Sequence, residues 1–225
     1  NFCFHLEKGE VFDTPQAILS YSGSGLAKLS QQYHEIIREH ICRGAYKHAE
    51  RPILINNWEA TYFDFNEEKI LKIAEQAQKL GIEMLVLDDG WFGKRDDDNS
   101  GLGDWFVNEK KMNGSMAQLA EKIHKMGMKF GLWFEPEMIS EDSDLYRAHP
   151  DWAFAVPGRV PNHGRNQLVL DMTRDDVREY LLERLTTIVH DAEIDYVKWD
   201  MNRSICDIYS HVAAQNRNGE LYHRY

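Results

Sequence analysis

Short apolar runs that alternate with amphipathic segments constrain the fold of this chain more than any other feature of its sequence. The apolar runs lie at residues 53–56, 84–87, 130–134 and 196–199. The segments that repeat apolar side chains at the spacing of one helical face lie at residues 66–80, 116–126 and 177–188. Apolar strands separated by amphipathic helices are typical of a parallel sheet with helices packed outside it. The sequence therefore predicts an α/β fold.

Two architectures satisfy this alternation, a doubly wound sheet and a (β/α)8 barrel. The glycine-rich phosphate turn of nucleotide-binding doubly wound sheets is absent from the sequence. Each predicted strand also ends in acidic, amide or aromatic residues, which is typical of the catalytic face of a barrel. A complete barrel needs roughly 250 residues, whereas the sequence shows about four βα units. We therefore expect a partial (β/α)8 TIM barrel, about the first half, in residues 26–225.

The first 25 residues have a different pattern. Residues 2–21 resemble strands, with an apolar pair before Pro15 and three apolar residues after it. Residues 22–25 read Ser-Gly-Ser-Gly, which is typical of a linker. We expect residues 1–25 to form the C-terminal end of a β-sandwich domain, its last hairpin, and the linker. A helix is then expected from Leu26, because its apolar residues lie on one helical face.

Composition excludes some classes of partner. The formal net charge of −11 argues against binding to nucleic acid or to an anionic membrane surface. The sequence contains no apolar run long enough to span a bilayer. Cys3, Cys42 and Cys206 are widely spaced, so they indicate neither a disulfide framework nor a zinc site, and a reducing compartment fits them.

The paired acids Asp88 and Asp89 end the second predicted strand, and Gly90 after them permits a sharp turn. Both carboxylates could then face one ligand, either as a metal pair or as acceptors for sugar hydroxyls. A metal is the weaker reading, because no His or further Asp lies nearby at ligand spacing. Capping of the next element remains an alternative for either Asp taken alone.

Asp200 is the strongest single catalytic candidate. It ends the strand at residues 196–199, and the cation of Lys198 would keep a partly buried carboxylate ionised. One reading is a nucleophile that attacks an anomeric carbon, with Lys198 and Asn202 binding sugar hydroxyls. The alternative is a structural ion pair between Asp200 and either Lys198 or Arg203.

Other polar and aromatic candidates surround these acids in the sequence. Trp58 and Trp133 end strands and could stack on a pyranose or fill the core. Arg165 lies in a polar loop and could donate paired hydrogen bonds to hydroxyls. Glu135 and Glu137 are either acid/base groups or braces for the site. The charged run at residues 94–99 is expected to be a solvated loop.

Six motifs in order resemble bacterial α-galactosidases of glycoside hydrolase family 36, the melibiase or raffinose type. They are Asn57-Trp58-Glu59-Ala60, Leu87-Asp88-Asp89-Gly90-Trp91-Phe92, Gly103-Asp104-Trp105, Trp133-Phe134-Glu135-Pro136-Glu137-Met138, Leu170-Asp171-Met172-Thr173 and Lys198-Trp199-Asp200-Met201-Asn202-Arg203. The resemblance implies a cytoplasmic glycoside hydrolase that retains configuration and removes terminal α-galactose from melibiose or raffinose-type oligosaccharides. It implies no cofactor and no metal, and a homo-oligomer, often a tetramer.

The resemblance also assigns roles to residues of this sequence. Asp200 matches the nucleophile, and Asp88 and Asp89 match the groups that bind the O4 and O6 side of galactose. Trp58 and Trp133 match the aromatic walls. Arg165, Lys198 and Asn202 match the residues that bind hydroxyls.

The sequence departs from the family pattern at the acid/base. In the family this group is an Asp in a glycine-rich segment beyond the nucleophile, and nothing after Asp200 resembles it. We therefore expect this chain to be a fragment of a longer enzyme that is inactive alone. An α-N-acetylgalactosaminidase, a non-catalytic galactoside-binding protein and an α/β scaffold domain without a site are the alternatives.

Overall fold

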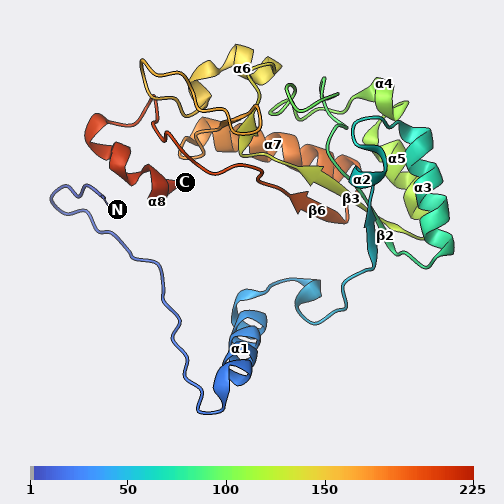
Figure 1. The fold of residues 1–225 in the computed structure, drawn as a ribbon, viewed down its shortest axis with the longest axis horizontal. Coiled ribbons are helices and arrows are strands. Elements are labelled where there is room, and N and C mark those ends of the chain that lie inside the picture. Colours follow the sequence, from blue (N-terminus) through green and yellow to red (C-terminus); the bar gives the residue numbers. More distant parts are fainter. Residues whose placement is uncertain (1–2) are drawn as a thin grey trace. The chain divides into compact units, whose positions relative to one another are not determined.

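The computed structural model describes residues 3–225 and divides into two compact units (Figure 1). One unit is Leu6–Pro52, and the other is Ile53–Tyr225 together with the residues up to His5. The boundary at residue 52 differs from the predicted one at residue 25, because the first long helix belongs to the smaller unit and not to the unit that holds the sheet.

The smaller unit consists of coil and one long helix. α1 covers Gly25–Ile36 and continues as a π-helical turn, Ile37–Ile41, before a 3-10 turn at Ala45–Lys47. None of the α1 residues is buried. Residues 3–24 contain no strand, so the predicted hairpin is not formed in the described part of the chain, and its first two residues lie outside that part. An isolated two-stranded hairpin is marginally stable without further strands, which explains the difference.

The larger unit is built on a parallel sheet, which confirms the predicted α/β fold. The strands are β1 Leu54–Asn56, β2 Met84–Leu87, β3 Lys129–Phe134 and β6 Tyr196–Trp199, in the spatial order β1-β2-β3-β6. All three pairings are parallel. A short antiparallel pair, β4 Met138–Ile139 with β5 Leu168–Val169, lies in the connection after β3.

The main helices of this unit cross between parallel strands. They are α3 Glu67–Lys79, α5 Met116–Lys125 and α7 Asp175–Asp191. Asn66 caps α3 by accepting from the Lys69 amide, as its position in the sequence predicts. Ser115 and Gln118 form a capping box at the start of α5. Figure 1 shows α7 running alongside β3 and β6.

Shorter elements make up the connections. They are α2 Trp58–Thr61, α4 Glu109–Met112, α6 Asp144–Ala148, the 3-10 turn Pro150–Trp152, the 3-10 helix Gln215–Glu220 and α8 Leu221–Arg224. None of the helices in the described residues 3–225 is both long and apolar enough to cross a membrane.

An aromatic cluster fills the centre of the larger unit. The rings of Trp91, Phe92 and Trp105 pack with one another, and Trp133 stacks on Phe92 with centroids 6.2 Å apart. Trp91 donates its indole N–H to the main-chain oxygen of Trp133 at 2.9 Å. This cluster fixes the carboxyl end of β3, where Trp133 lies.

Asp195 joins the amino ends of β3 and β6. Its Oδ2 accepts the main-chain N–H of Phe130 at 2.9 Å and lies 2.9 Å from the Nε2 of His124, a residue of α5. The Asp195 amide in turn donates to the Phe130 oxygen at 2.9 Å. The two strands are therefore anchored at the end of the sheet opposite their carboxyl termini.

Candidate active site

The carboxyl ends of the four parallel strands bring the predicted polar residues to one edge of the sheet. Asn56 ends β1, Asp88 follows β2, Glu135 follows β3 and Asp200 follows β6. Parallel strands place these ends side by side, and this is the face on which barrel enzymes carry their active sites. Asp88 and Glu135 are buried, whereas Asp200 is half-buried.

Asp200 is held by three hydrogen-bond donors. Its Oδ2 accepts the indole N–H of Trp133 at 3.0 Å and the side-chain amide of Asn202 at 2.8 Å. Its Oδ1 accepts the main-chain N–H of Met201 at 3.0 Å. Burial alone would raise the pKa of Asp200, but these donors, together with the charge of Lys198, hold the pKa below its ordinary value. The carboxylate is therefore kept ionised, as a nucleophile requires.

Lys198 forms its ion pair with Asp88 at 2.7 Å. The same Oδ2 of Asp88 accepts the side-chain amide of Asn56 at 2.5 Å. Lys198 and Asp200 lie two residues apart at the end of β6, so their side chains leave the same face. Lys198 thus pairs with Asp88 and acts on Asp200 through its charge alone, so the alternative of a structural Asp200–Lys198 pair is not what the geometry shows.

Asp89 is paired with an arginine that sequence reasoning missed. Arg95 donates through Nε at 3.1 Å and through Nη2 at 2.8 Å to the Asp89 carboxylate, and both residues are buried. Burial raises the pKa of Asp89, and Arg95 opposes that effect. The prediction that residues 94–99 form a solvated loop is therefore wrong at Arg95, which is 2% exposed. A buried carboxylate requires a partner, and spacing alone did not identify which charged residue supplies it.

The two predicted aromatic walls differ in their surroundings. Trp58 is half-buried and meets Tyr62 and Phe63 edge-on, at 5.3 and 5.1 Å between ring centroids. Trp133 is only 2% exposed and lies in the aromatic cluster, because it is the penultimate residue of the central strand β3. In the structure Trp133 offers Asp200 an N–H donor and not an open stacking face.

Arg165 is not in contact with Asp200. It lies in a loop, in the left-handed conformation with φ of 52°, and its nearest ionic partner is Asp98 at 3.6 Å. Asp98 lies at the same distance, 3.6 Å, from Arg95. Arg165 is therefore connected to the Asp89 side of the site, although its guanidinium is largely exposed.

The two glutamates after β3 act as acceptors. Glu135 Oε1 accepts the main-chain N–H of Asn202 at 2.5 Å and the side chain of Gln167 at 2.8 Å. Glu137 accepts the indole N–H of Trp199 at 2.9 Å and the hydroxyl of Tyr225 at 2.7 Å. These hydrogen bonds hold both carboxylates in place. They favour the alternative that the two glutamates support the site over an acid/base role. Gln167, buried in the core, is a site residue for which the sequence contained no signal.

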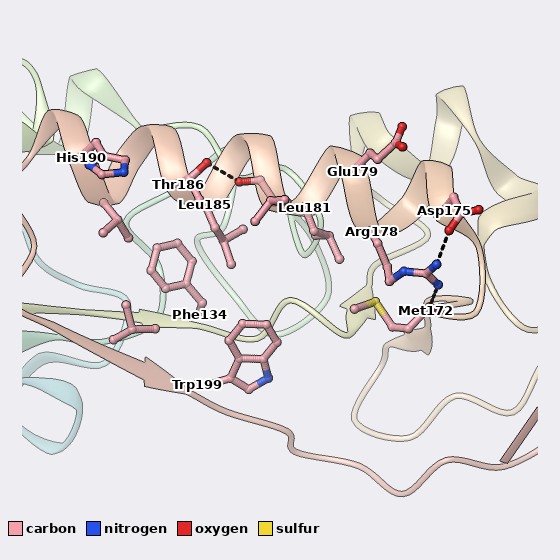
Figure 2. Close-up of a pocket in the computed structure, with 13 residues that line it drawn as sticks. Phe134, Met172, Asp175, Arg178, Glu179, Leu181, Leu185, Thr186, His190 and Trp199 are labelled. Atoms are coloured by element: carbon pink, nitrogen blue, oxygen red, sulfur yellow. Dashed lines mark hydrogen bonds and ion pairs between the residues drawn. The ribbon is translucent and has the colours of Figure 1, made fainter. Parts of the chain in front are cut away.

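A separate apolar groove lies beside this site. It has a volume of about 650 Å³ and is lined by residues of α7 and β6, together with Phe134 and Met172. In Figure 2, Phe134 and Trp199 point toward Leu181 and Leu185 of α7. The groove contains neither the paired acids nor Asp200, so it is not the polar site. Within residues 3–225, no three His, Cys, Asp or Glu side chains are placed to hold a metal ion.

Comparisons with known proteins identify the family to which this chain belongs. The Melibiase family model matches residues 11–225. The α-galactosidase AgaA of Geobacillus stearothermophilus is 53% identical over the full chain, and the bifunctional α-galactosidase/sucrose kinase AgaSK of Mediterraneibacter gnavus is 57% identical over 93% of it. The chain spans 31% of the first relative and 22% of the second.

Solved structures agree with the sequence matches. The crystal structure of the GH36 α-galactosidase AgaA matches with a TM-score of 0.89 at 55% identity. The match covers 91% of this chain and 29% of the AgaA chain. Variants of AgaA have been solved in complex with raffinose and with stachyose. With the family model matched over nearly all of its length, this chain belongs to the Melibiase family, the GH36 α-galactosidases.

Proposed function

We propose that the polypeptide to which these residues belong is a retaining α-galactosidase, which removes terminal α-galactosyl residues from melibiose or raffinose-type oligosaccharides. The observation that carries this proposal is the placement of Asp200, ionised and held by three donors, beside the Lys198–Asp88 pair. The raffinose and stachyose complexes of AgaA support the substrate class.

In the proposed reaction, a carboxylate oxygen of Asp200 attacks the anomeric carbon of the galactosyl residue. The bond from that carbon to the leaving oxygen breaks, and the leaving oxygen takes a proton from a general acid. Water, deprotonated by the same group, then attacks the anomeric carbon and releases Asp200. A retaining enzyme places the two carboxyl groups about 5 Å apart. We assign the general acid to a part of the longer polypeptide outside these 225 residues.

The remaining residues would select galactose. Asp88 and Asp89 would accept hydroxyls on the O4 and O6 side, and Lys198 and Asn202 would donate to other hydroxyls. Trp58 offers the half-buried aromatic face, and Arg165 would approach from its loop. The equatorial O4 of glucose would leave a buried acceptor unpaired, which is a costly mismatch.

The architecture we propose for the longer polypeptide is a (β/α)8 barrel, of which this chain supplies about the first half. Four parallel strands with helices crossing between them support it, as does the coverage of 31% of AgaA. A cytoplasmic location and a homo-oligomeric, tetrameric state complete the proposal, and the three free cysteines fit a reducing compartment.

The complete polypeptide tests this function directly. It should hydrolyse an aryl α-galactoside and release α-galactose first, as observed by proton NMR. Asp200→Asn should abolish turnover, and a mechanism-based galactosyl fluoride should label Asp200, as located by peptide mass spectrometry. Asp191→Asn, which changes an exposed acid of α7, serves as the control. Full activity of Asp200→Asn, or β-galactose as the first product, would contradict the proposal.

A further inference from the structure

The strongest unassigned feature of the site is the burial of Glu135 behind the nucleophile. Glu135 directly follows β3 and is 1% exposed. A buried carboxylate is costly unless donors satisfy it. Its Oε1 receives two such donors, from Asn202 and from Gln167, which lie 67 and 32 residues away in the sequence. Glu135 therefore joins three separate segments at one atom.

The contact with Asn202 has a direct consequence for Asp200. The main-chain N–H of Asn202 donates to Glu135 at 2.5 Å, while its side-chain amide donates to Asp200 at 2.8 Å. Residues 200–202 follow β6 without helix or strand structure, so no regular backbone ladder fixes the Asn202 side chain. The hydrogen bond to Glu135 holds the main chain of Asn202 at this point, and the Asn202 side chain contacts Glu135 as well.

We propose that Glu135 is a positioning residue for the nucleophile, because by binding the main-chain amide of Asn202 it keeps the side chain of Asn202 on Asp200. This inference rests on the proposed function of Asp200. Trp133, two residues earlier on the same strand end, supplies the other side-chain donor to Asp200. β3 thus supports the nucleophile of β6 through one direct contact and one indirect contact.

Gln167, the other partner of Glu135, is also held by a second residue, Arg203. Arg203 donates to the main-chain oxygens of Asn162, at 2.7 Å, and of Gln167. The loop that carries Arg165 is therefore held by Arg203 as well as by Glu135. Loss of the Glu135 carboxylate should loosen Asn202 more than it loosens this loop, so the reactivity of Asp200 should suffer more than substrate binding.

The experiment compares Glu135→Leu and Glu135→Gln in the complete polypeptide. The rate at which a galactosyl fluoride labels Asp200, per active site, reports nucleophile reactivity, and the dissociation constant of a galactose-shaped iminosugar reports binding. Glu135→Leu should slow labelling by at least about tenfold, the value of one charge-assisted hydrogen bond. Its binding constant should change by less than about threefold. Glu135→Gln keeps a carbonyl acceptor and should recover most of the labelling rate.

The Glu135→Leu change is also made in an Asn202→Ala variant, and the two losses of labelling rate are compared. Asn202→Ala keeps the main-chain N–H but removes the amide that reaches Asp200, so Glu135→Leu should add no further loss of labelling rate there. Glu137→Gln is the matched control, since its partners are Trp199 and Tyr225. If Glu135→Leu does not fold, Glu135→Met takes its place, because it is close to glutamate in length and also lacks an acceptor for the Asn202 amide.

Two results would overturn the inference. They are labelling of Glu135→Leu, or of Glu135→Met where Glu135→Leu does not fold, at the wild-type rate, and losses of labelling rate that multiply in the Asn202→Ala background. If the wild type is active and Asp200→Asn is not, either of these refutes the role of Glu135 alone. If the wild type shows no α-galactosidase activity, the proposed function itself fails.

Discussion

At the scale of single residues, the charge of Asp200 is maintained by hydrogen bonds and not by a direct ion pair. Its donors are Trp133, Asn202 and the Met201 amide, while the nearest cation, Lys198, is paired with Asp88. This division leaves Lys198 close enough to lower the pKa of Asp200 without occupying its oxygens. One carboxylate oxygen of Asp200 can therefore approach a substrate carbon without first breaking a salt bridge.

Trp133→Phe tests the donor closest to the core. The ring would still fill the aromatic cluster, but the N–H that reaches Asp200 at 3.0 Å would be lost. A hydrogen bond to a charged group contributes about 1.5–3 kcal/mol, so we expect kcat of the complete enzyme to fall by about tenfold or more. The acid limb of kcat/KM should move to higher pH, because a donor to the ionised form is removed.

Trp199→Phe is the control for this experiment. Trp199 is also an indole at a strand end, but its N–H donates to Glu137. The acid limb of kcat/KM in Trp199→Phe should lie at the same pH as in the wild type. An unchanged acid limb in Trp133→Phe would show that this indole does not set the charge of Asp200.

The lowered pKa of Asp200 also links stability to pH. Its donors favour the ionised carboxylate in the folded state, although burial acts against them. Their contribution to folding is therefore present above the pKa that the side chain has in the unfolded chain. It is lost as the pH falls through the lower folded value. We expect the thermal midpoint of the wild type to fall over this range more than that of Asp200→Asn, as measured by calorimetry at a series of pH values. Parallel curves would argue against the lowered pKa.

At the scale of elements, the connection after β2 depends on Arg95. Arg95 donates to Asp89 and, through Nη1, to the Ser100 oxygen at 2.9 Å, so it ties its loop to the strand end. Arg95→Met would leave the buried Asp89 charge unpaired, at a cost of about 3–5 kcal/mol. A large fall in the thermal midpoint is expected. Lys94→Met, its exposed neighbour, should change stability by less than about 0.5 kcal/mol. Equal effects of the two changes would refute the importance of the buried pair.

The elements also show what the sequence could and could not predict. The apolar runs and the helix caps predicted β2, β3, α3 and α5 because each signal is local, as with Asn66 before α3. The hairpin expected before residue 25 depends on partner strands, which a local pattern cannot supply. The candidate acids were visible in the sequence because acids at strand ends have few roles. Arg95 and Gln167 were not, since their importance comes from contacts made in three dimensions.

At the scale of the whole molecule, the sheet has two open edges within the described residues 3–225. β1 and β6 are the outer strands, and on β6 Tyr196, Val197 and Trp199 are exposed. Exposed apolar edges promote association between copies. We expect the isolated chain to associate in sedimentation velocity, and Val197→Lys to reduce that association. Val160→Lys, in an exposed loop away from the sheet, should have no such effect.

The same Val197→Lys change should act in the opposite sense in the complete polypeptide. If a further strand covers β6 there, as the proposed barrel requires, a buried lysine will lower the thermal midpoint. A midpoint equal to that of the wild type would show that this edge is open in the longer protein as well, which would contradict the barrel.

Asp195 joins β3 and β6 at the end of the sheet away from Asp200, through Phe130 and His124. The contacts of Asp195 that stabilise this pair of strands and the carboxylate of Asp200 thus lie at opposite ends of the pair. Adaptation to a hotter environment can proceed by substitutions around Asp195 while the end of the sheet that carries Asp200 remains unaltered. Variants selected for heat tolerance alone should accumulate their changes at that remote anchor and leave turnover intact.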